Sequence, residues 1–197
     1  MLLNRVEKAM MNNPVREAVQ RQYEMRKLRS MGGRVEGARC LEIGCGRGVG
    51  VEIVLDSFGA EHVDGIDLDP DMITRARLRL ARRGAQVSLW VGSATQIDAG
   101  DEVYDAVFDF GIIHHIPEWR DALREVHRVL RPGGRFFAEE VFAKFILHPV
   151  WRRVLVHPLE DRFDRATFEH ALEDAGFRLL ASDELLGEFG FFVAERV

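Results

Sequence analysis

The sequence predicts an α/β fold in three layers, with a seven-stranded, mostly parallel sheet between helices and an antiparallel strand pair at its C-terminal end. Three observations predict it. Short apolar segments of strand length alternate with helical segments across residues 38–141. A glycine-rich turn joins the first strand to its helix. The last two strands, 177–182 and 189–195, are separated only by a short turn, which favours antiparallel pairing.

The order of the elements follows from apolar periodicity. Strands are expected at residues 38–44, 62–67, 86–91, 104–110, 135–141, 177–182 and 189–195. Helices are expected at residues 2–11, 14–30, 48–59, 70–83, 118–130 and 165–175. In the helix 70–83, Met72, Ala76 and Leu80 recur at every fourth position opposite an arginine-rich face, as in a helix that packs on a sheet.

Several boundaries are marked by residues that begin or end helices. Asn13 is placed to cap the helix that begins at Pro14, because proline fits the first helical position. Asp69 stands in the same relation to Pro70. The segment Pro132-Gly133-Gly134 cannot continue a helix and separates helix 118–130 from the fifth strand.

The turn after the first strand contains glycine at alternate positions, namely Gly44, Gly46 and Gly48. Such turns bring backbone N–H groups close to a ligand at a helix N-terminus. Glycine is required there because a side chain would block the approach and because a tight turn uses positive φ angles. The turn therefore predicts a ligand site at the carboxyl end of the first strand.

The spacing of these glycines distinguishes between ligands. A dinucleotide fingerprint requires its third glycine where this chain has Val49 or Val51. A Walker loop requires a lysine, which residues 44–50 do not contain. The remaining pattern is an acidic residue, Glu42, followed by the alternate glycines. A carboxylate at this position suits a cationic ligand that has no pyrophosphate.

Two later strands also end in candidate ligand residues. Asp67 closes the second strand 23 residues after Gly44, a spacing at which a carboxylate can accept hydrogen bonds from ribose hydroxyls. Asp69 is the competing carboxylate, but it is better explained as a helix cap. The fourth strand is followed by His114 and His115, in the crevice where open α/β sheets bind ligands. One imidazole could take a proton from a substrate, and capping of the next helix is the alternative.

Together these motifs resemble the class I S-adenosylmethionine (SAM)-dependent methyltransferases. The glycine turn with Glu42 resembles their motif I, His114-His115 resembles the ubiquinone/menaquinone C-methyltransferase-like group (methyltransferase type 11), and Leu130 to Gly134 matches the turn before strand five. The resemblance implies a Rossmann-like fold, SAM as cofactor, S-adenosylhomocysteine as product and no metal. It implies cofactor contacts by Glu42, Gly44, Cys45, Gly46, Gly48, Asp67, Leu68, Ser93, Ala94, Asp109 and Phe110.

Ser93 departs from the family pattern, which usually has an acidic residue there near the adenine amino group. A serine hydroxyl accepts a hydrogen bond more weakly than a carboxylate. The backbone N–H of Ala94 remains a candidate for a contact with adenine N1.

The substrate side is less clearly marked. By the same resemblance, His114 and His115 are the candidate catalytic residues, and the N-terminal helices, within residues 1–34, form a lid from which Tyr23 could close over the site. Further candidate substrate contacts lie at the end of strand five and at the start of the insertion 142–165. They are Glu139, Glu140 and Phe142, with strand alternation turning only one of the two glutamates inward.

The insertion is apolar and basic, which suits a cap over a hydrophobic substrate or contact with a membrane surface. A core helix or half of a dimer interface explains the same composition. The expected partners are a small-molecule acceptor, lipid-like or aromatic, while peripheral membrane or lipid contact and a homodimer stay open.

Bulk properties limit the remaining function classes. A chain of 197 residues is expected to form one domain, and its net charge of −5 argues against nucleic-acid binding. Residues 1–39 carry nine Lys/Arg and four Asp/Glu, hence +5, and the rest carries −10. Two cysteines, Cys40 and Cys45, and the lack of a signal segment favour the cytoplasm. Alternatives to an active methyltransferase are a non-catalytic SAM-binding regulatory protein and an NAD-dependent oxidoreductase.

Overall fold

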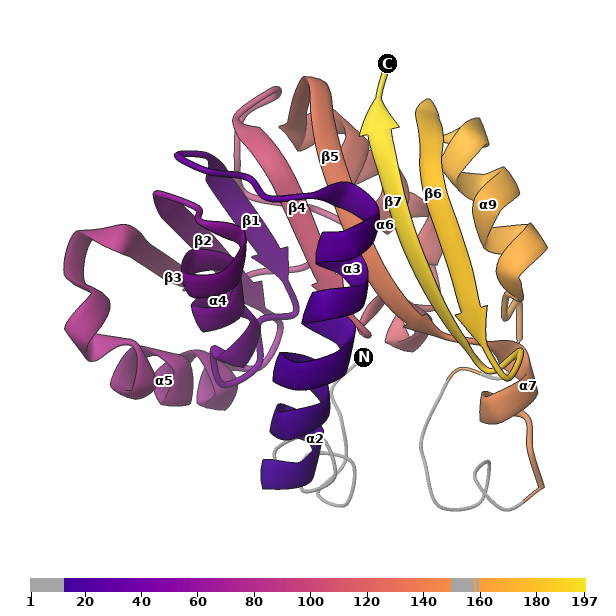
Figure 1. Cartoon of the computed structure of the whole chain (residues 1–197), viewed down its shortest axis with the longest axis horizontal. Coiled ribbons are helices and arrows are strands. Elements are labelled where there is room, and N and C mark those ends of the chain that lie inside the picture. Colours follow the sequence, from indigo (N-terminus) through magenta and orange to yellow (C-terminus); the bar gives the residue numbers. More distant parts are fainter. Residues whose placement is uncertain (1–12, 150–157, 159) are drawn as a thin grey trace.

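The computed structural model describes residues 13–149, 158 and 160–197, and its centre is a seven-stranded sheet (Figure 1). The strands are β1 (Arg39–Ile43), β2 (His62–Asp67), β3 (Val87–Val91), β4 (Tyr104–Phe110), β5 (Leu130–Val141), β6 (Phe177–Leu185) and β7 (Phe189–Arg196). Their order in the sheet is β3-β2-β1-β4-β5-β7-β6. β7 is antiparallel to both of its neighbours, and the other pairs are parallel. The predicted fold class is therefore confirmed.

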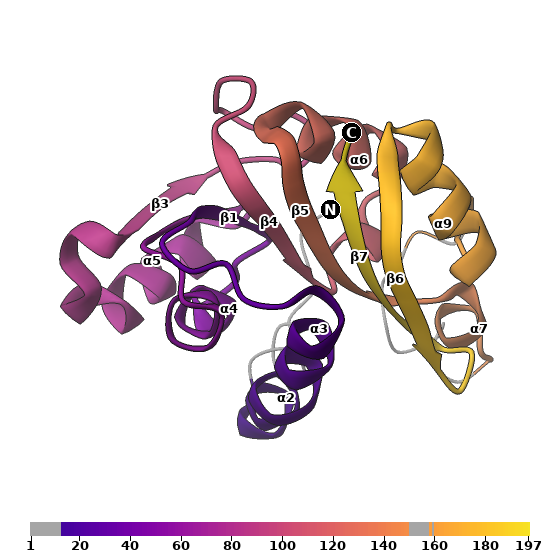
Figure 2. The ribbon, with the colours of Figure 1, turned by 45° about the horizontal axis from the view of Figure 1, so that its top comes forward.

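Helices cover both faces of the sheet (Figures 1 and 2). The α-helices are α2 (Pro14–Val19), α3 (Met25–Gly32), α4 (Val49–Ile53), α5 (Pro70–Arg79), α6 (Trp119–Val129), α7 (Ala143–Ile146) and α9 (Arg165–Asp174). Helices α6 and α9 bury Trp119 and Phe168 in the core on one face. Helices α3, α4 and α5 contribute to the core on the other face. A parallel sheet requires this double cover because its strands are apolar on both sides.

Short segments of other helix types also occur among the described residues. They are the π-helical η1 (Gln20–Glu24) and η2 (Val54–Phe58), and the 3-10 segments η3 (Ala81–Gln86) and η4 (Ile113–His115). Within the described residues, no helix combines the length and the apolar character needed to cross a membrane.

The N-terminal helix begins where the sequence predicts. The Asn13 side chain accepts a hydrogen bond from the Arg16 backbone N–H at 2.9 Å, and Pro14 occupies the first turn. Helix continues through α2, η1 and α3 to Gly32. The expected helix at residues 2–11 lies outside the described residues.

The predicted start of β5 was wrong by five residues. The strand begins at Leu130, directly after α6, because Leu130 already pairs with Tyr104. The next paired residues are Ala106 and Arg135, so residues 131–134 bulge out of the ladder. The Pro-Gly-Gly segment that was expected to end a helix therefore forms an irregularity inside a strand.

Candidate functional site

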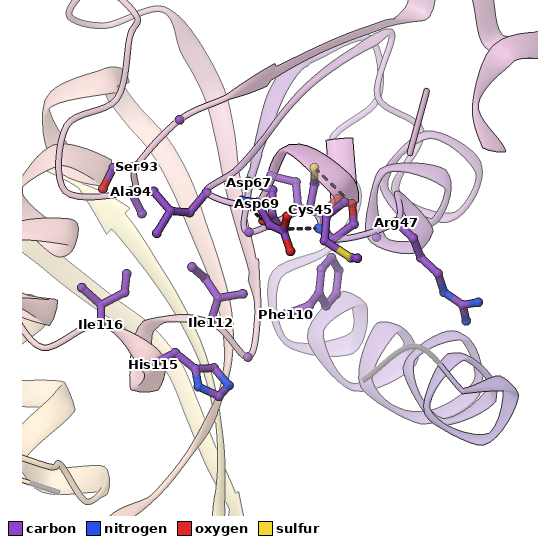
Figure 3. Close-up of a pocket in the computed structure, with 18 of the residues that line it drawn as sticks. Cys45, Arg47, Asp67, Asp69, Ser93, Ala94, Phe110, Ile112, His115 and Ile116 are labelled. Carbon is purple, nitrogen blue, oxygen red and sulfur yellow. Dashed lines mark hydrogen bonds between the residues drawn. The ribbon is translucent and has the colours of Figure 1, made fainter. Parts of the chain in front are cut away.

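A cavity of about 240 Å³ opens at the carboxyl ends of the parallel strands (Figure 3). The turn after β1 and the ends of β2, β3 and β4 form its walls, and α2 and η1 contribute Arg16 and Gln20. This is the place where open α/β sheets bind ligands, because the strand order reverses between β1 and β4. The predicted site residues that line it are Glu42, Gly44, Cys45, Gly46, Asp67, Leu68, Ser93, Ala94, Phe110 and His115.

Glu42 is a carboxylate buried in the wall of this cavity. Its side chain is 2% exposed and receives a hydrogen bond from the backbone N–H of Val51, while no atom of the described chain hydrogen-bonds to Oε2. Burial, with Asp67 and Asp109 nearby, raises the pKa of Glu42 well above its usual range. A buried carboxyl group without a cationic partner suits a ligand that brings positive charge.

Gly50, in the first turn of α4, makes the position of Glu42 possible. A Cβ atom on Gly50 would lie 2.5 Å from Cδ of Glu42 and would overlap with Oε1. The sequence analysis did not identify Gly50, because the contact joins a strand to a helix. A glycine in the first turn of a predicted helix was the available signal, since glycine is otherwise unfavourable there.

The glycine turn has the geometry expected from its sequence. Gly44, Gly46 and Gly48 have φ angles of 66°, 52° and 87°. A side chain on Gly44 would also collide with Ile112, since its Cβ would lie 2.7 Å from Cγ1 of that residue. Gly48 caps α4 and does not line the cavity, so its predicted cofactor contact stays a prediction.

Asp67 and Asp69 both line the cavity but differ in local role. Asp69 caps α5, with its Oδ1 accepting from the Asp71 N–H at 3.0 Å, as predicted. Asp67 accepts hydrogen bonds at 2.8 Å from the backbone N–H groups of Gly46 and Asp69. It thereby joins the glycine turn to the end of β2. The proposed ribose contact of Asp67 remains a prediction.

The turn after β3 carries hydroxyl groups where the family has a carboxylate. Ser93 and Thr95 line the cavity beside Ala94, and their hydroxyl oxygens are 2.8 Å apart. Either hydroxyl can act as the donor, so this wall offers both a donor and an acceptor to a ligand.

The loop after β4 is ordered by two buried carboxyl groups. Asp109, fully buried, accepts from the Ile112 N–H at 2.9 Å and does not line the cavity, whereas Phe110 does. Glu140 accepts from the Ile113 and His114 N–H groups at 2.7 and 3.1 Å. Neither Asp109 nor Glu140 lines the cavity, so their predicted contacts with ligands have no support there. Both residues instead hold the loop from its buried side.

The two histidines take different positions on this loop. Nδ1 of His114 lies 2.6 Å from Oε2 of Glu140, and His114 does not line the cavity. His115 lines the cavity, with its ring centroid 4.2 Å from that of His114. In Figure 3, His115, Ile112 and Ile116 lie opposite Asp67 and Cys45.

Glu139 and Glu140 point to opposite faces of β5, as alternation predicts, but both are buried. Oε2 of Glu139 lies 3.3 Å from Nη2 of Arg16, whose Nη1 lies 2.6 Å from both carboxylate oxygens of Glu24. Burial raises the pKa of Glu139 to about 8 and that of Glu140 to about 7. Arg16 is a site residue that the sequence analysis missed.

These raised pKa values predict that the protein becomes less stable as the pH rises. Between the unfolded pKa of about 4.3 and the folded pKa values of about 8 and about 7 for Glu139 and Glu140, the folded chain holds protons that the unfolded chain releases. The free energy of unfolding is therefore expected to fall from about pH 5.5 to about pH 8.5.

Urea unfolding across this range measures the effect. Glu139→Gln should flatten the dependence, whereas Glu173→Gln, on an exposed side chain of α9, should leave it unchanged. Stability that stays constant or increases across the range contradicts the assigned shifts.

Two further candidates lie away from the cavity. Tyr23 is 44% exposed and packs edge-on against Phe191, with the two ring centroids 5.8 Å apart. Phe142 is 1% exposed and packs against Phe192 in the core. Neither lines the cavity, so their predicted substrate contacts have no support in this conformation. Instead of Tyr23, the N-terminal helix presents Arg16 and Gln20.

The fold and the site together define a class of protein. A reversed seventh strand between β5 and β6 distinguishes this sheet from the six-stranded dinucleotide fold. The cavity combines a glycine turn, a buried carboxyl group and an aspartate at the end of β2. These are the features of class I SAM-dependent methyltransferases, and the uncompensated Glu42 fits the positive charge of SAM.

Comparisons with known proteins agree. A family model described as a methyltransferase domain matches residues 40–134. The fatty-acid O-methyltransferase of Mycolicibacterium smegmatis is 35% identical over 133 residues, covering 67% of this chain and 47% of that protein. The ubiquinone biosynthesis O-methyltransferase of Xylella fastidiosa is 31% identical over 156 residues, covering 74% of this chain and 63% of that protein.

Among solved structures, a chain from the complex of the Haloferax volcanii Trm112 methyltransferase activator with a methyltransferase is similar in fold. Its TM-score is 0.79 at 18% identity, over 99% of both chains. The chain belongs to the class I SAM-dependent methyltransferases, and the expected cofactor, SAM, is confirmed as that of its family. It spans less than two thirds of the length of either curated relative.

Proposed function

We propose that this protein is an active SAM-dependent methyltransferase whose acceptor is a small, largely apolar molecule, lipid-like or aromatic. One observation carries the proposal: the same cavity is lined by Glu42 and the glycine turn on one side and by His115 on the other. The names of the relatives, a fatty-acid and a ubiquinone O-methyltransferase, support an acceptor with an apolar body.

When bound, SAM supplies an activated methyl group, so the chain itself contributes alignment, exclusion of water and proton transfer. Glu42 faces the positive charge, and the backbone of Gly44 and Gly46 allows close approach. The proposed role of His115 is to take the proton that an acceptor hydroxyl or amine loses. Glu140 and Asp109 hold the loop on which His115 lies.

The segments outside the central unit are proposed to enclose the acceptor. The N-terminal helix acts as a lid through Arg16 and Gln20. Within the insertion 142–165, residues 150–157 and 159 lie outside the described residues. In its described part, Arg162 donates a hydrogen bond at 2.8 Å to the backbone carbonyl of His114. This bond links the insertion to the loop after β4, which carries His115. Membrane contact, a homodimer and a cytoplasmic location remain expectations.

Isothermal titration with SAM, S-adenosylhomocysteine and NADH tests the proposal first, followed by transfer of labelled methyl from SAM to a panel of lipid-like and phenolic acceptors. Micromolar binding of both adenosyl ligands, no binding of NADH and methylation of an acceptor support it. Adenosyl binding without transfer to any acceptor favours a regulatory SAM-binding protein. Binding of NADH without binding of either adenosyl ligand would instead support an NAD-dependent oxidoreductase.

His115→Gln is expected to lower kcat by about 100-fold or more, because general-base catalysis contributes about 10²–10⁴-fold. The affinity for S-adenosylhomocysteine should change little. His170→Gln, on an exposed histidine of α9, is the matched control and should retain full activity. An unchanged kcat for His115→Gln would remove the proton-acceptor role while leaving the cofactor site intact.

A further inference from the structure

The cavity has two walls with different chemistry. Most of the predicted cofactor contacts lie on the wall formed by the glycine turn and the ends of β2 and β3. The lining residues that remain for the acceptor, here called the acceptor wall, include Arg16 and Gln20 from the N-terminal helix. From the loop after β4 they include Ile112, His115, Ile116 and Glu118, an exposed carboxylate that adds no positive charge. The charge on this second wall therefore decides which acceptor head groups can enter.

Among the described residues that line the cavity, the arginines are Arg16 and Arg47, and both already face carboxylates. Nη2 of Arg47 lies 2.8 Å from Oε2 of Glu17, and Figure 3 shows its side chain directed away from His115. Arg16 is the cation on the acceptor wall. Its guanidinium contacts two carboxyl groups, those of Glu24 and Glu139.

The Arg16 cluster has no surplus positive charge. Glu24 is 5% and Glu139 is 3% exposed, so solvent does little to screen them. With both carboxyl groups ionised, the three side chains sum to −1. With Glu139 protonated, as its raised pKa of about 8 favours at neutral pH, they sum to zero. Burial also raises the pKa of Glu24, but Nη1 of Arg16 lies 2.6 Å from both of its carboxylate oxygens, and this contact favours the ionised form. With Glu24 ionised, Arg16 offers no net charge to an anion in either state of Glu139.

An anionic head group placed here would lose its hydration without gaining a free cation, at an uncompensated desolvation cost. A hydroxyl brings no charge to desolvate, and an ammonium group is compensated by the negative charge of the cluster when both carboxyl groups are ionised. The apolar side chains of Ile112 and Ile116 suit an apolar body. We propose that, for the methyltransferase activity proposed above, the acceptor wall selects apolar molecules with an uncharged or cationic head group and discriminates against carboxylates and phosphates.

The test uses 1-octanol, octylamine and octanoate, which share one alkyl chain and differ in head-group charge. Each is titrated at about pH 8 into the full chain saturated with S-adenosylhomocysteine. Octanol and octylamine are expected to bind on the order of tenfold more tightly than octanoate, which corresponds to about 1.4 kcal/mol.

Glu24→Gln keeps the side-chain shape and removes one negative charge from Arg16, so it should raise octanoate affinity to within about threefold of octanol. If the first variant folds poorly, Glu139→Gln tests the same effect from β5 at about pH 9, above the pKa of about 8 of the Glu139 carboxyl group in the wild-type protein. Glu173→Gln, exposed on α9, should keep the wild-type preference.

Octanoate binding as tightly as octanol in the wild-type protein overturns the proposal. So does a failure of both octanol and octylamine to bind to protein that binds S-adenosylhomocysteine. Failure of the proposed function has a different signature, namely head-group preference without methyl transfer to any acceptor.

Discussion

Gly50→Ala is expected to lower the affinity for S-adenosylhomocysteine by on the order of 100-fold, about 2.7 kcal/mol. Replacing glycine by alanine inside a helix normally stabilises a protein by about 0.5–1 kcal/mol. Here the new Cβ would lie 2.5 Å from Cδ of Glu42 and would overlap with Oε1. Glu42 is 2% exposed and lies beside Asp67 and Asp109, so it has little room to move.

The carboxyl group of Glu42 is the flexible end of its side chain, and its displacement is the least costly response to the new methyl group. For that reason the cofactor affinity should fall more than the stability. Isothermal titration and thermal unfolding of the same variant separate the two effects.

Gly100→Ala is the matched control, since its Cβ would meet Val103 Cγ2 at an ordinary 3.6 Å. It should leave the affinity for S-adenosylhomocysteine unchanged. Wild-type affinity in Gly50→Ala would show that Glu42 does not face the cofactor, and the assignment of the buried carboxyl group would have to be abandoned.

The central part of the fold was predictable because its signals are local. Alternating apolar segments marked β1 to β5, and Asp69 before Pro70 marked a helix start that the structure reproduces. The glycine turn was predictable for the same reason, since its backbone angles are a property of the turn itself. The start of β5 was not, because the pairing of Leu130 with Tyr104 depends on a neighbouring strand.

The site was predictable only where a side chain acts at the end of its own strand. Glu42, Asp67 and His115 follow from the topology, since parallel strands direct their carboxyl ends to one edge. Asp109 and Glu140 were assigned to ligands, yet they hold backbone N–H groups of the loop. Sequence alone could not distinguish these roles, because both require a buried carboxyl group at a strand end.

The N-terminal helix shows a second limit of pattern analysis. In its first part, residues 14–24, the apolar residues Val15, Val19 and Tyr23 are exposed, whereas Gln20 and Glu24 are buried. Over this part the usual rule, in which the apolar stripe faces the protein, therefore points to the wrong face. Ion pairs hold this part instead, with Glu17 contacting Arg21, Arg47 and Arg79, whereas α3 is held by core packing. Partly exposed pairs of this kind contribute little each, which is compatible with the lid proposed above.

Glu140→Ala is expected to destabilise the fold by on the order of 3 kcal/mol, the second large effect that the structure predicts. The fully buried carboxyl group of Glu140 accepts from the backbone N–H groups of Ile113 and His114, and its Oε2 lies 2.6 Å from Nδ1 of His114. Alanine would leave these polar groups buried without an acceptor, and each such group costs about 1–3 kcal/mol. Removing a buried carboxyl group with a raised pKa recovers part of this cost.

The loss should appear in urea unfolding at about pH 7 and as a decrease in Tm of about 6–12 °C for a chain of this size. Glu188→Ala, at the turn between β6 and β7, is the control: its side chain is 31% exposed and 4.0 Å from Lys144, so it should change stability by less than about 0.5 kcal/mol. Because Glu140 holds the loop that carries His115, any folded Glu140→Ala protein should also lose kcat while it still binds S-adenosylhomocysteine. A stable variant with full kcat would show that the loop keeps its position without Glu140, and the positioning of His115 would then have to come from Asp109 and Arg162.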